Sequence, residues 1–270
     1  MSVLIVILFG VLIFLVVLKN RQHIKNISRQ NKFEIGSAQS IGTRQIQQDV
    51  LSVKMKNDSI LLSIADGLSQ NGHVAANLAI NTFENLFAES NSDKPQYFFK
   101  RAANSANQKI VNVLEERQGE TSIASVLIRK SEMFYTLVGN CKIAIFRDGD
   151  LIPVSEGQTI DVLARHKYDE GSISKQTTLA LLNERRRYNV LGSDYFQDVE
   201  LFSKPLILQS GDLVVLMTEG ITNVLRWIDL ENILNRSETA ANLAIEIIKM
   251  IDRSQYADKD NASILIYRHG

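Results

Sequence analysis

Four acidic residues stand close to the ends of predicted strands. They are Asp49, Asp66, Glu219 and Asp260. Each one lies within two residues of a short apolar run, so its side chain would emerge at the rim of a sheet. Hard divalent cations such as Mg²⁺ and Mn²⁺ prefer carboxylate oxygens and water as ligands. These residue types therefore allow a divalent metal site, although sequence spacing alone does not show that the four acids converge.

The register of the first predicted hairpin places Asp49 opposite Asp66. The loop Asn57-Asp58 separates two apolar runs and can close a two-residue turn. Pairing outward from that loop gives one consistently apolar face, which a slip of one residue would break. Directly opposed residues have Cβ atoms about 4.5–5.5 Å apart, and like charges there repel each other. A bound cation would make the pair favourable, whereas the alternative is two solvated aspartates at a fraying hairpin end.

Short strands and longer helices must position these acids. Strands rich in Val, Ile, Leu and aromatic residues are expected at 50–56, 59–65, 123–129, 133–138, 142–147, 151–154, 213–218 and 262–267. Helical periodicity is expected over 73–89, 97–116 and 238–253. Ser237 is the predicted N-cap of the last helix, and Asp148-Gly149 is typical of a two-residue hairpin turn. Strand groups flanked by long helices, without strict alternation, predict a layered α+β fold.

The N-terminal segment 1–18 differs from the rest of the chain, because it has no charged side chain and no amphipathic period. A membrane-spanning helix needs about 20 apolar residues, with about 17 as the lower limit. Basic residues follow this run, whereas a signal peptide carries its positive charge in front of it. We therefore expect 1–18 to be a transmembrane signal anchor in the cell membrane and 19–32 a basic juxtamembrane segment. The remainder would be cytoplasmic. A buried core helix is the weaker alternative.

The composition is that of a globular protein with one large domain. Apolar residues make up 45% of the 270 residues and charged residues 22%. The single cysteine, Cys141, excludes an internal disulfide. Thirty basic residues balance thirty acidic ones, but five of the basic residues lie in 19–32, which leaves 25 against 30 in 33–270. A mildly acidic domain suits a cation-binding protein better than a nucleic-acid-binding one.

Six short sequence blocks follow one another along the chain, and their combined order and spacing are more specific than any single motif. They are 42–49 (GTRQIQQD), 64–68 (IADGL), 134–149 (FYTLVGNCKIAIFRDG), 169–192, 210–220 (SGDLVVLMTEG) and 260–263 (DNAS). Each block alone is weak, because Asp-Gly and Asp-Asn pairs are common in turns. Together they resemble the metal-dependent type 2C (PPM-type) serine/threonine protein phosphatases, particularly the bacterial branch.

This resemblance implies a fold and a set of site residues. The implied fold is a four-layer α/β/β/α sandwich with two central, mainly antiparallel sheets over 33–270, and a flap at about 162–188. Arg44 falls on the family's phosphate-binding arginine, whose planar guanidinium can bind phosphoryl oxygens bidentately. The implied ligands of two Mn²⁺ or Mg²⁺ ions are Asp49, Asp66, the Gly67 carbonyl, Glu219 and Asp260.

The implied activity is hydrolysis of phosphoserine and phosphothreonine through a water activated by the two metals. The substrate would be a phosphorylated protein, such as the target of a partner serine/threonine kinase, and the enzyme would be tethered to the membrane. No side chain resembles a covalent nucleophile.

Several positions depart from the family pattern. Glu219 stands where the family has Asp, and Gln47 replaces Asn. Asn140 replaces an aspartate that is associated with an accessory third metal. These departures leave a second hypothesis open: a catalytically weak or inactive pseudophosphatase that binds phosphoproteins or acts as a scaffold at the membrane. The run Arg185-Arg186-Arg187 in the predicted flap could dock an acidic substrate or form a solvated charged face.

Overall fold

The computed structural model describes residues 33–89, 94–115 and 117–270. The predicted anchor at 1–18 and the predicted juxtamembrane segment at 19–32 lie outside these residues. Within the described ranges, no helix combines the length and the apolar character needed to cross a membrane.

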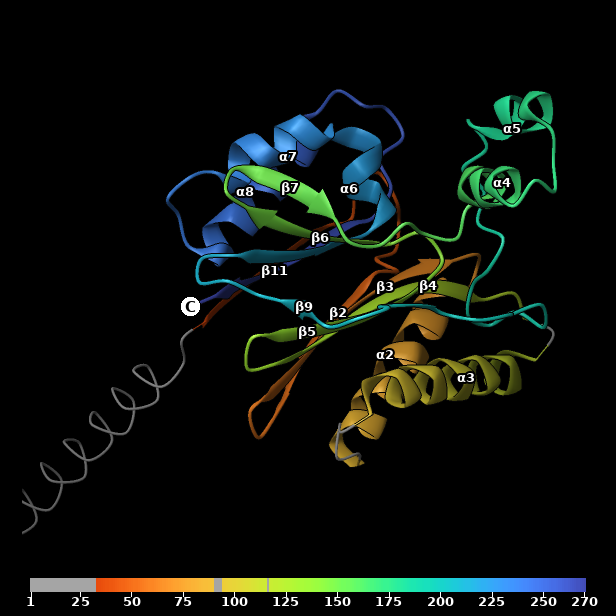
Figure 1. Cartoon of the computed structure of the whole chain (residues 1–270), viewed down its shortest axis with the longest axis horizontal. Coiled ribbons are helices and arrows are strands. Elements are labelled where there is room, and N and C mark those ends of the chain that lie inside the picture. The colour runs from red at the N-terminus through yellow and green to blue at the C-terminus, as the bar shows by residue number, and fades with distance from the viewer. Residues whose placement is uncertain (1–32, 90–93, 116) are drawn as a thin grey trace, which may run out of the picture.

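Two antiparallel sheets stack at the centre of the molecule (Figure 1). The strands are β1 (Phe33–Ser40), β2 (Val50–Lys56), β3 (Ser59–Leu68), β4 (Glu120–Arg129), β5 (Glu132–Val138), β6 (Lys142–Arg147), β7 (Asp150–Pro153), β8 (Glu200–Leu201), β9 (Leu206–Ile207), β10 (Leu213–Met217) and β11 (Ala262–His269). The first sheet has the order β1-β11-β10-β6-β7. The second has the order β2-β3-β4-β5-β8, and β9 also pairs with β5.

Helices cover the outer face of each sheet and complete the four layers (Figure 1). The helices are α2 (Gly72–Glu89), α3 (Pro95–Leu114), α4 (Ile160–Asp169), α5 (Lys175–Leu181), α6 (Glu219–Val224), α7 (Trp227–Leu234) and α8 (Ala240–Arg253). Helices α2 and α3 pack on the second sheet, whereas α6, α7 and α8 pack on the first. Helices α4 and α5 project from one side of the sandwich, within the segment predicted to be a flap. The predicted α+β sandwich with two antiparallel sheets is confirmed.

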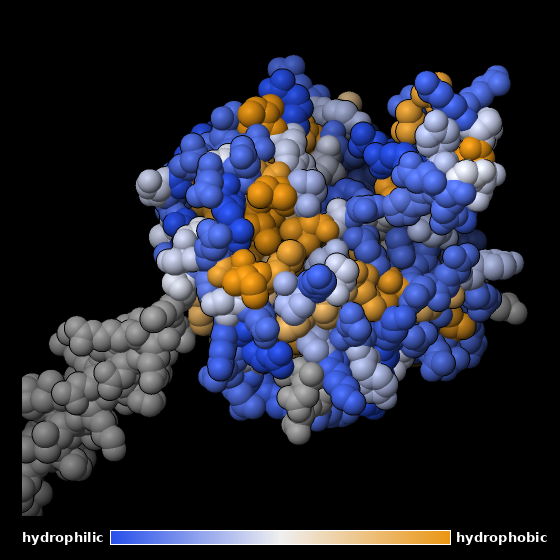
Figure 2. Space-filling view, in the orientation of Figure 1, coloured by the Kyte–Doolittle hydropathy of each residue, from blue (hydrophilic) through white to orange (hydrophobic). Residues whose placement is uncertain are grey.

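Three apolar clusters hold the layers together. Phe83, Phe87 and Phe99 pack between the second sheet and its helices, and Leu243 and Ile247 fill the corresponding layer of the first sheet. The space between the sheets contains Leu62, Ile64, Leu216 and Leu265. Burying one such side chain stabilises the folded state by about 1.5–3 kcal/mol. Apolar side chains also gather in a band on the face shown in Figure 2. Among the exposed apolar residues are Ile152 of β7 and Ile207 of β9.

The predicted register of the β2–β3 hairpin is confirmed. Leu51 pairs with Ile64, and Val53 with Leu62, around a turn in which Asn57 has a φ of 52°. Strand β3 continues beyond the predicted end at residue 65 and includes Asp66 and Gly67. Strand β2 is an edge strand and is only half-buried, so its predicted apolar face is less enclosed than that of β3.

The prediction of Ser237 as an N-cap is wrong. Helix α8 begins two residues later than that cap requires, and Thr239 is the N-cap, its Oγ1 accepting a hydrogen bond from the Asn242 amide at 3.3 Å. The Ala240 amide donates to the Glu34 carboxylate at 3.0 Å, a contact with β1 that fixes where the helix starts. Since β1 lies more than 200 residues away along the chain, this determinant is not visible locally.

Candidate metal centre

Strand ends from both sheets bring the four predicted acids to one end of the sandwich. Asp49 precedes β2 and Asp66 lies near the end of β3, so the hairpin register places them opposite each other. Glu219 is the first residue of α6 and follows β10, whereas Asp260 precedes β11 by two residues. The charges of these acids act on one another, since those of Asp49, Asp260 and Glu219 all raise the pKa of Asp66.

Asp49 is a buried carboxylate with one oxygen unsatisfied. Its Oδ2 accepts hydrogen bonds from the hydroxyls of Thr218 at 2.9 Å and Ser263 at 2.7 Å. Its Oδ1 is buried without any hydrogen-bond partner. Burial raises the pKa of Asp49 to about 6, although the two hydroxyls oppose this shift. A buried, unsatisfied carboxylate oxygen is costly unless it faces a cation.

Asp66 is held by tight packing at the end of β3. Burial raises its pKa well above the ordinary value, and the charge of Asp49 adds to the effect. The next residue, Gly67, contacts the start of α2 so closely that a Cβ there would lie 2.5 Å from the Gly72 carbonyl carbon and 2.7 Å from the Gln48 carbonyl oxygen. Only glycine fits this position, which brings the backbone next to Asp66 against α2.

Glu219 and Asp66 share an arginine that sequence reasoning missed. Arg187 Nη2 donates to Glu219 Oε2 at 2.7 Å and to Asp66 Oδ2 at 3.2 Å. Its Nε donates to Asn140 Oδ1 at 2.6 Å. The run of three arginines is therefore not one uniform surface, because Arg186 is exposed and pairs with Glu184 whereas Arg187 points into the centre. No signal in the sequence separates these two neighbours.

Arg44 lies at the rim of the acidic cluster, which consists of Asp49, Asp66, Glu219 and Asp260. Its Nε donates to Asp260 Oδ1 and its Nη1 to Asp258 Oδ1, both at 2.9 Å. The hydrogen bond and the charge of Asp260 raise the pKa of Arg44. Its side chain remains 43% exposed, so the guanidinium is open to solvent beside the acids.

The donor set fits a hard divalent cation, although the acids are not already gathered around one point. Within 33–89, 94–115 and 117–270, no three Asp, Glu, His or Cys side chains form a metal-binding group as they stand. The Arg187 guanidinium contacts two of the four acids. The unsatisfied Asp49 Oδ1 and the raised pKa values of Asp49 and Asp66 nevertheless show negative charge that is incompletely balanced. The residues that would hold the metals are Asp49, Asp66, Gly67, Glu219 and Asp260.

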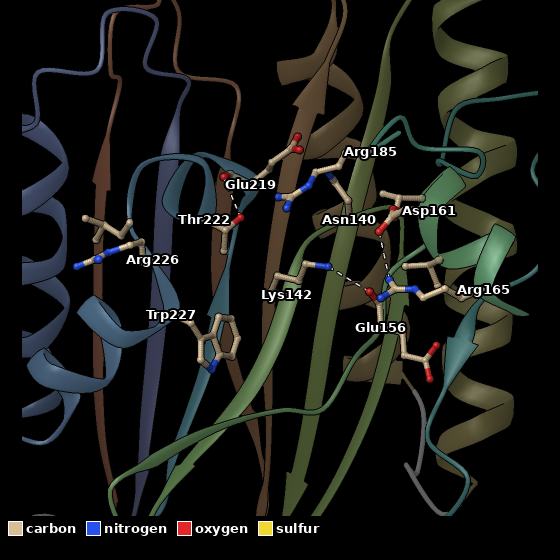
Figure 3. Close-up of a pocket in the computed structure, with 13 residues that line it drawn as sticks. Asn140, Lys142, Glu156, Asp161, Arg165, Arg185, Glu219, Thr222, Arg226 and Trp227 are labelled. Atoms are coloured by element: carbon tan, nitrogen blue, oxygen red, sulfur yellow. Dashed lines mark hydrogen bonds and ion pairs between the residues drawn. The ribbon is translucent and has the colours of Figure 1, made fainter. Parts of the chain in front are cut away.

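A cavity of about 390 Å³ adjoins this centre (Figure 3). Glu219, one of the four acids, lines this cavity together with Asn140 and Trp227. Figure 3 shows Lys142 from β6 and Arg185 from the flap in the same cavity. The cavity therefore presents both basic and acidic side chains beside Glu219.

Comparison with known proteins identifies relatives by sequence and by fold. No family model matches the chain. A serine/threonine phosphatase, stp, of Listeria welshimeri is 20% identical over 221 residues, which cover 78% of this chain and 85% of the relative. The stp phosphatase of Listeria monocytogenes serovar 1/2a matches with the same identity and coverage.

Solved structures of the same class share the fold. The S. agalactiae serine/threonine phosphatase superposes with a TM-score of 0.75 at 19% identity, over 88% of this chain and 100% of that one. The catalytic domain of the phosphatase PstP, solved in complex with two manganese ions, has a TM-score of 0.69 at 20% identity, over 87% of this chain and 97% of that one. The PPM Ser-Thr phosphatase MsPP from Mycobacterium smegmatis, solved with cacodylate, also has a TM-score of 0.69, at 17% identity over 87% and 98% of the two chains.

The chain therefore has the fold of the PPM-type phosphatases, and the resemblance inferred from its sequence blocks is confirmed. Its curated relatives and structural neighbours are bacterial serine/threonine phosphatases, which does not favour the non-catalytic alternative.

Proposed function

We propose that the chain is a metal-dependent phosphatase that hydrolyses phosphoserine and phosphothreonine in proteins. The observation that carries this proposal is the buried pair Asp49 and Asp66, whose raised pKa values reflect negative charge placed together away from water. The sequence and fold relationships to serine/threonine phosphatases support it, as does the solvent-exposed Arg44 at the rim.

The chain's own residues prepare the centre for this chemistry. When bound, a pair of divalent cations supplies an activated water and neutralises charge on the phosphoryl group. Thr218 and Ser263 fix the Asp49 carboxylate, which leaves its Oδ1 free of protein donors. Arg44 exchanges its exposed contacts with Asp258 and Asp260 for the phosphoryl oxygens of the substrate.

Cys141 is unsuited to act as a covalent nucleophile. Its thiol is fully buried, and burial raises its pKa well above the ordinary value. The thiol therefore stays protonated, whereas nucleophilic attack requires the thiolate. Transfer of the phosphoryl group directly to water is the reaction that this centre supports.

The decisive experiment is metal-dependent phosphate release by the 270-residue chain. We expect hydrolysis of an aryl phosphate and of a phosphothreonine peptide in Mn²⁺, and none after chelation. Asp66→Asn should reduce the rate by at least about 100-fold, because it removes a buried carboxylate charge that is assigned to the metals. Asp58→Asn, in the exposed hairpin loop, is the matched control and should leave the rate unchanged. Full activity in Asp66→Asn would contradict the proposal. The absence of turnover by the folded chain in both Mn²⁺ and Mg²⁺ would also contradict it.

We also propose that residues 1–32 tether this phosphatase to the cell membrane, with the folded domain on the cytoplasmic side. The support is the uncharged apolar run at 1–18 followed by five basic residues. The basic residues would in addition attract anionic lipid headgroups.

A further inference from the structure

The positively charged guanidinium of Arg187 lies within the acidic cluster. It contacts two of the four acids, Asp66 and Glu219, and the neutral Asn140. The Arg187 side chain is only 21% exposed, so these contacts are shielded from solvent. Arginine presents a planar fork of donors and remains charged at all ordinary pH values, which suits it to a lasting position between carboxylates.

Backbone pairing at the base of the flap fixes the position from which the Arg187 side chain extends. Arg187 forms an isolated antiparallel bridge with Thr159, where the chain enters the flap. The Tyr188 amide donates to the Gln158 carbonyl at 3.0 Å, and the Ile160 amide donates to the Arg186 carbonyl at 2.9 Å. The two chain segments at the base of the flap are therefore fixed to each other, and the position of Arg187 is tied to the start of α4.

The neutral residue Asn140 matches this arrangement. It is buried, and its Oδ1 accepts a hydrogen bond from Arg187 Nε and another from Ser122 Oγ at 3.1 Å. These two donors satisfy the amide oxygen and hold the guanidinium in its orientation. Asn140 thus positions the arginine without adding a further negative charge to the cluster.

The oxygens that Arg187 contacts belong to two residues assigned to the metals. A divalent cation that binds Asp66 Oδ2 or Glu219 Oε2 would meet the guanidinium at the same oxygens, and like charges repel at such short range. We propose that Arg187 and a divalent metal ion compete for the carboxylates of Asp66 and Glu219, so that Arg187 is a positioning residue that sets the metal affinity of the centre. This inference rests on the proposed function, because that function supplies the metals.

Calorimetric titration of Mn²⁺ into the 270-residue chain tests this competition without measuring activity. Arg187→Gln keeps a polar side chain and removes the charge, and it should bind Mn²⁺ at least about tenfold more tightly than the unchanged chain. Arg186→Gln is the matched control, because that side chain is 78% exposed and pairs with Glu184 rather than with the acids of the centre; the Mn²⁺ affinity of this variant should be unchanged. Arg187→Lys, which keeps the charge but loses the fork, should give an affinity between the two.

Three results would overturn the inference, and they differ in what else they contradict. An unchanged or weaker Mn²⁺ affinity in Arg187→Gln would remove Arg187 from competition while leaving the proposed function intact. An equal gain in Arg186→Gln would show a general effect of charge rather than a contact at the centre. No Mn²⁺ binding by any folded variant would contradict both the competition and the metal-dependent function. Should Arg187→Gln fail to fold, the affinity of Arg187→Lys decides between gain and no gain.

Discussion

At the scale of single residues, the proposed metal centre depends on the carboxylates of Asp49 and Asp66. Both lie where the sequence places them, because an apolar register and a two-residue loop determine their pairing. Arg187 could not be predicted in the same way. Its contact with Asp66 joins residues 121 positions apart, and nothing in three consecutive arginines shows which one turns inward.

The raised pKa of Asp49 predicts how the stability of the metal-free chain depends on pH. The folded chain keeps a proton on Asp49 up to about pH 6, whereas the ordinary pKa is 3.8. The folded state therefore binds more protons than the unfolded state in this range, so its stability falls as the pH rises from about 4 through about 6. Asp66 acts in the same direction.

Thermal unfolding in a chelator at about pH 5 and about pH 7 measures this dependence. The decrease in Tm should be smaller in Asp49→Asn than in the unchanged chain, because one titrating group is removed. Asp58→Asn, in the exposed loop, should keep the full decrease. An identical decrease in Asp49→Asn and the unchanged chain would show that Asp49 ionises normally.

At the scale of elements, local signals predicted the strands and long helices better than their ends. The β2–β3 hairpin agrees with the predicted register because its turn and its apolar pattern specify the same pairing. The strand β1 and the short helices α4 to α7 were not predicted. Strand β1 pairs with β11, which lies more than 200 residues later in the chain, and its burial pattern does not alternate in the way that predicts a strand. Tertiary contacts likewise decide where α8 begins.

The start of α8 can be tested by comparing two cap candidates. Thr239→Ala removes the side-chain acceptor of the Asn242 amide and should lower the free energy of unfolding by about 1 kcal/mol. Ser237→Ala should change it by less than about 0.5 kcal/mol, because Ser237 lies outside the helix and is exposed. Urea unfolding measures both. A larger loss in Ser237→Ala than in Thr239→Ala would place the helix start where the sequence pattern suggested.

At the scale of the whole molecule, the sandwich brings together acids that lie far apart in the sequence. Each sheet contributes two acids, so the centre exists only when both sheets are formed and stacked. The zero formal charge of the chain combines a basic segment at 19–32 with a domain of 25 basic and 30 acidic residues. Sequence composition predicted this division and the single domain. The stacking of the sheets followed from the family resemblance rather than from periodicity.

The membrane tether is tested by placing charge in the apolar run. An arginine near the middle of a spanning helix costs about 2.5–3.5 kcal/mol. We expect the unchanged chain to remain in the membrane fraction after alkaline carbonate extraction, and the double variant Leu8→Arg/Val11→Arg to be released. The matched control, Leu61→Met in the core of the domain, should stay in the membrane fraction. Release of the unchanged chain by carbonate would contradict the tether.

The most direct measurement of the metal centre is anomalous diffraction from crystals of the chain grown with Mn²⁺. We predict two manganese peaks within the cluster formed by Asp49, Asp66, Gly67, Glu219 and Asp260, with the Arg187 guanidinium moved away from Asp66 and Glu219. Manganese bound elsewhere on the molecule, with no peak among these residues, would contradict a metal-dependent phosphatase centre at this end of the sandwich.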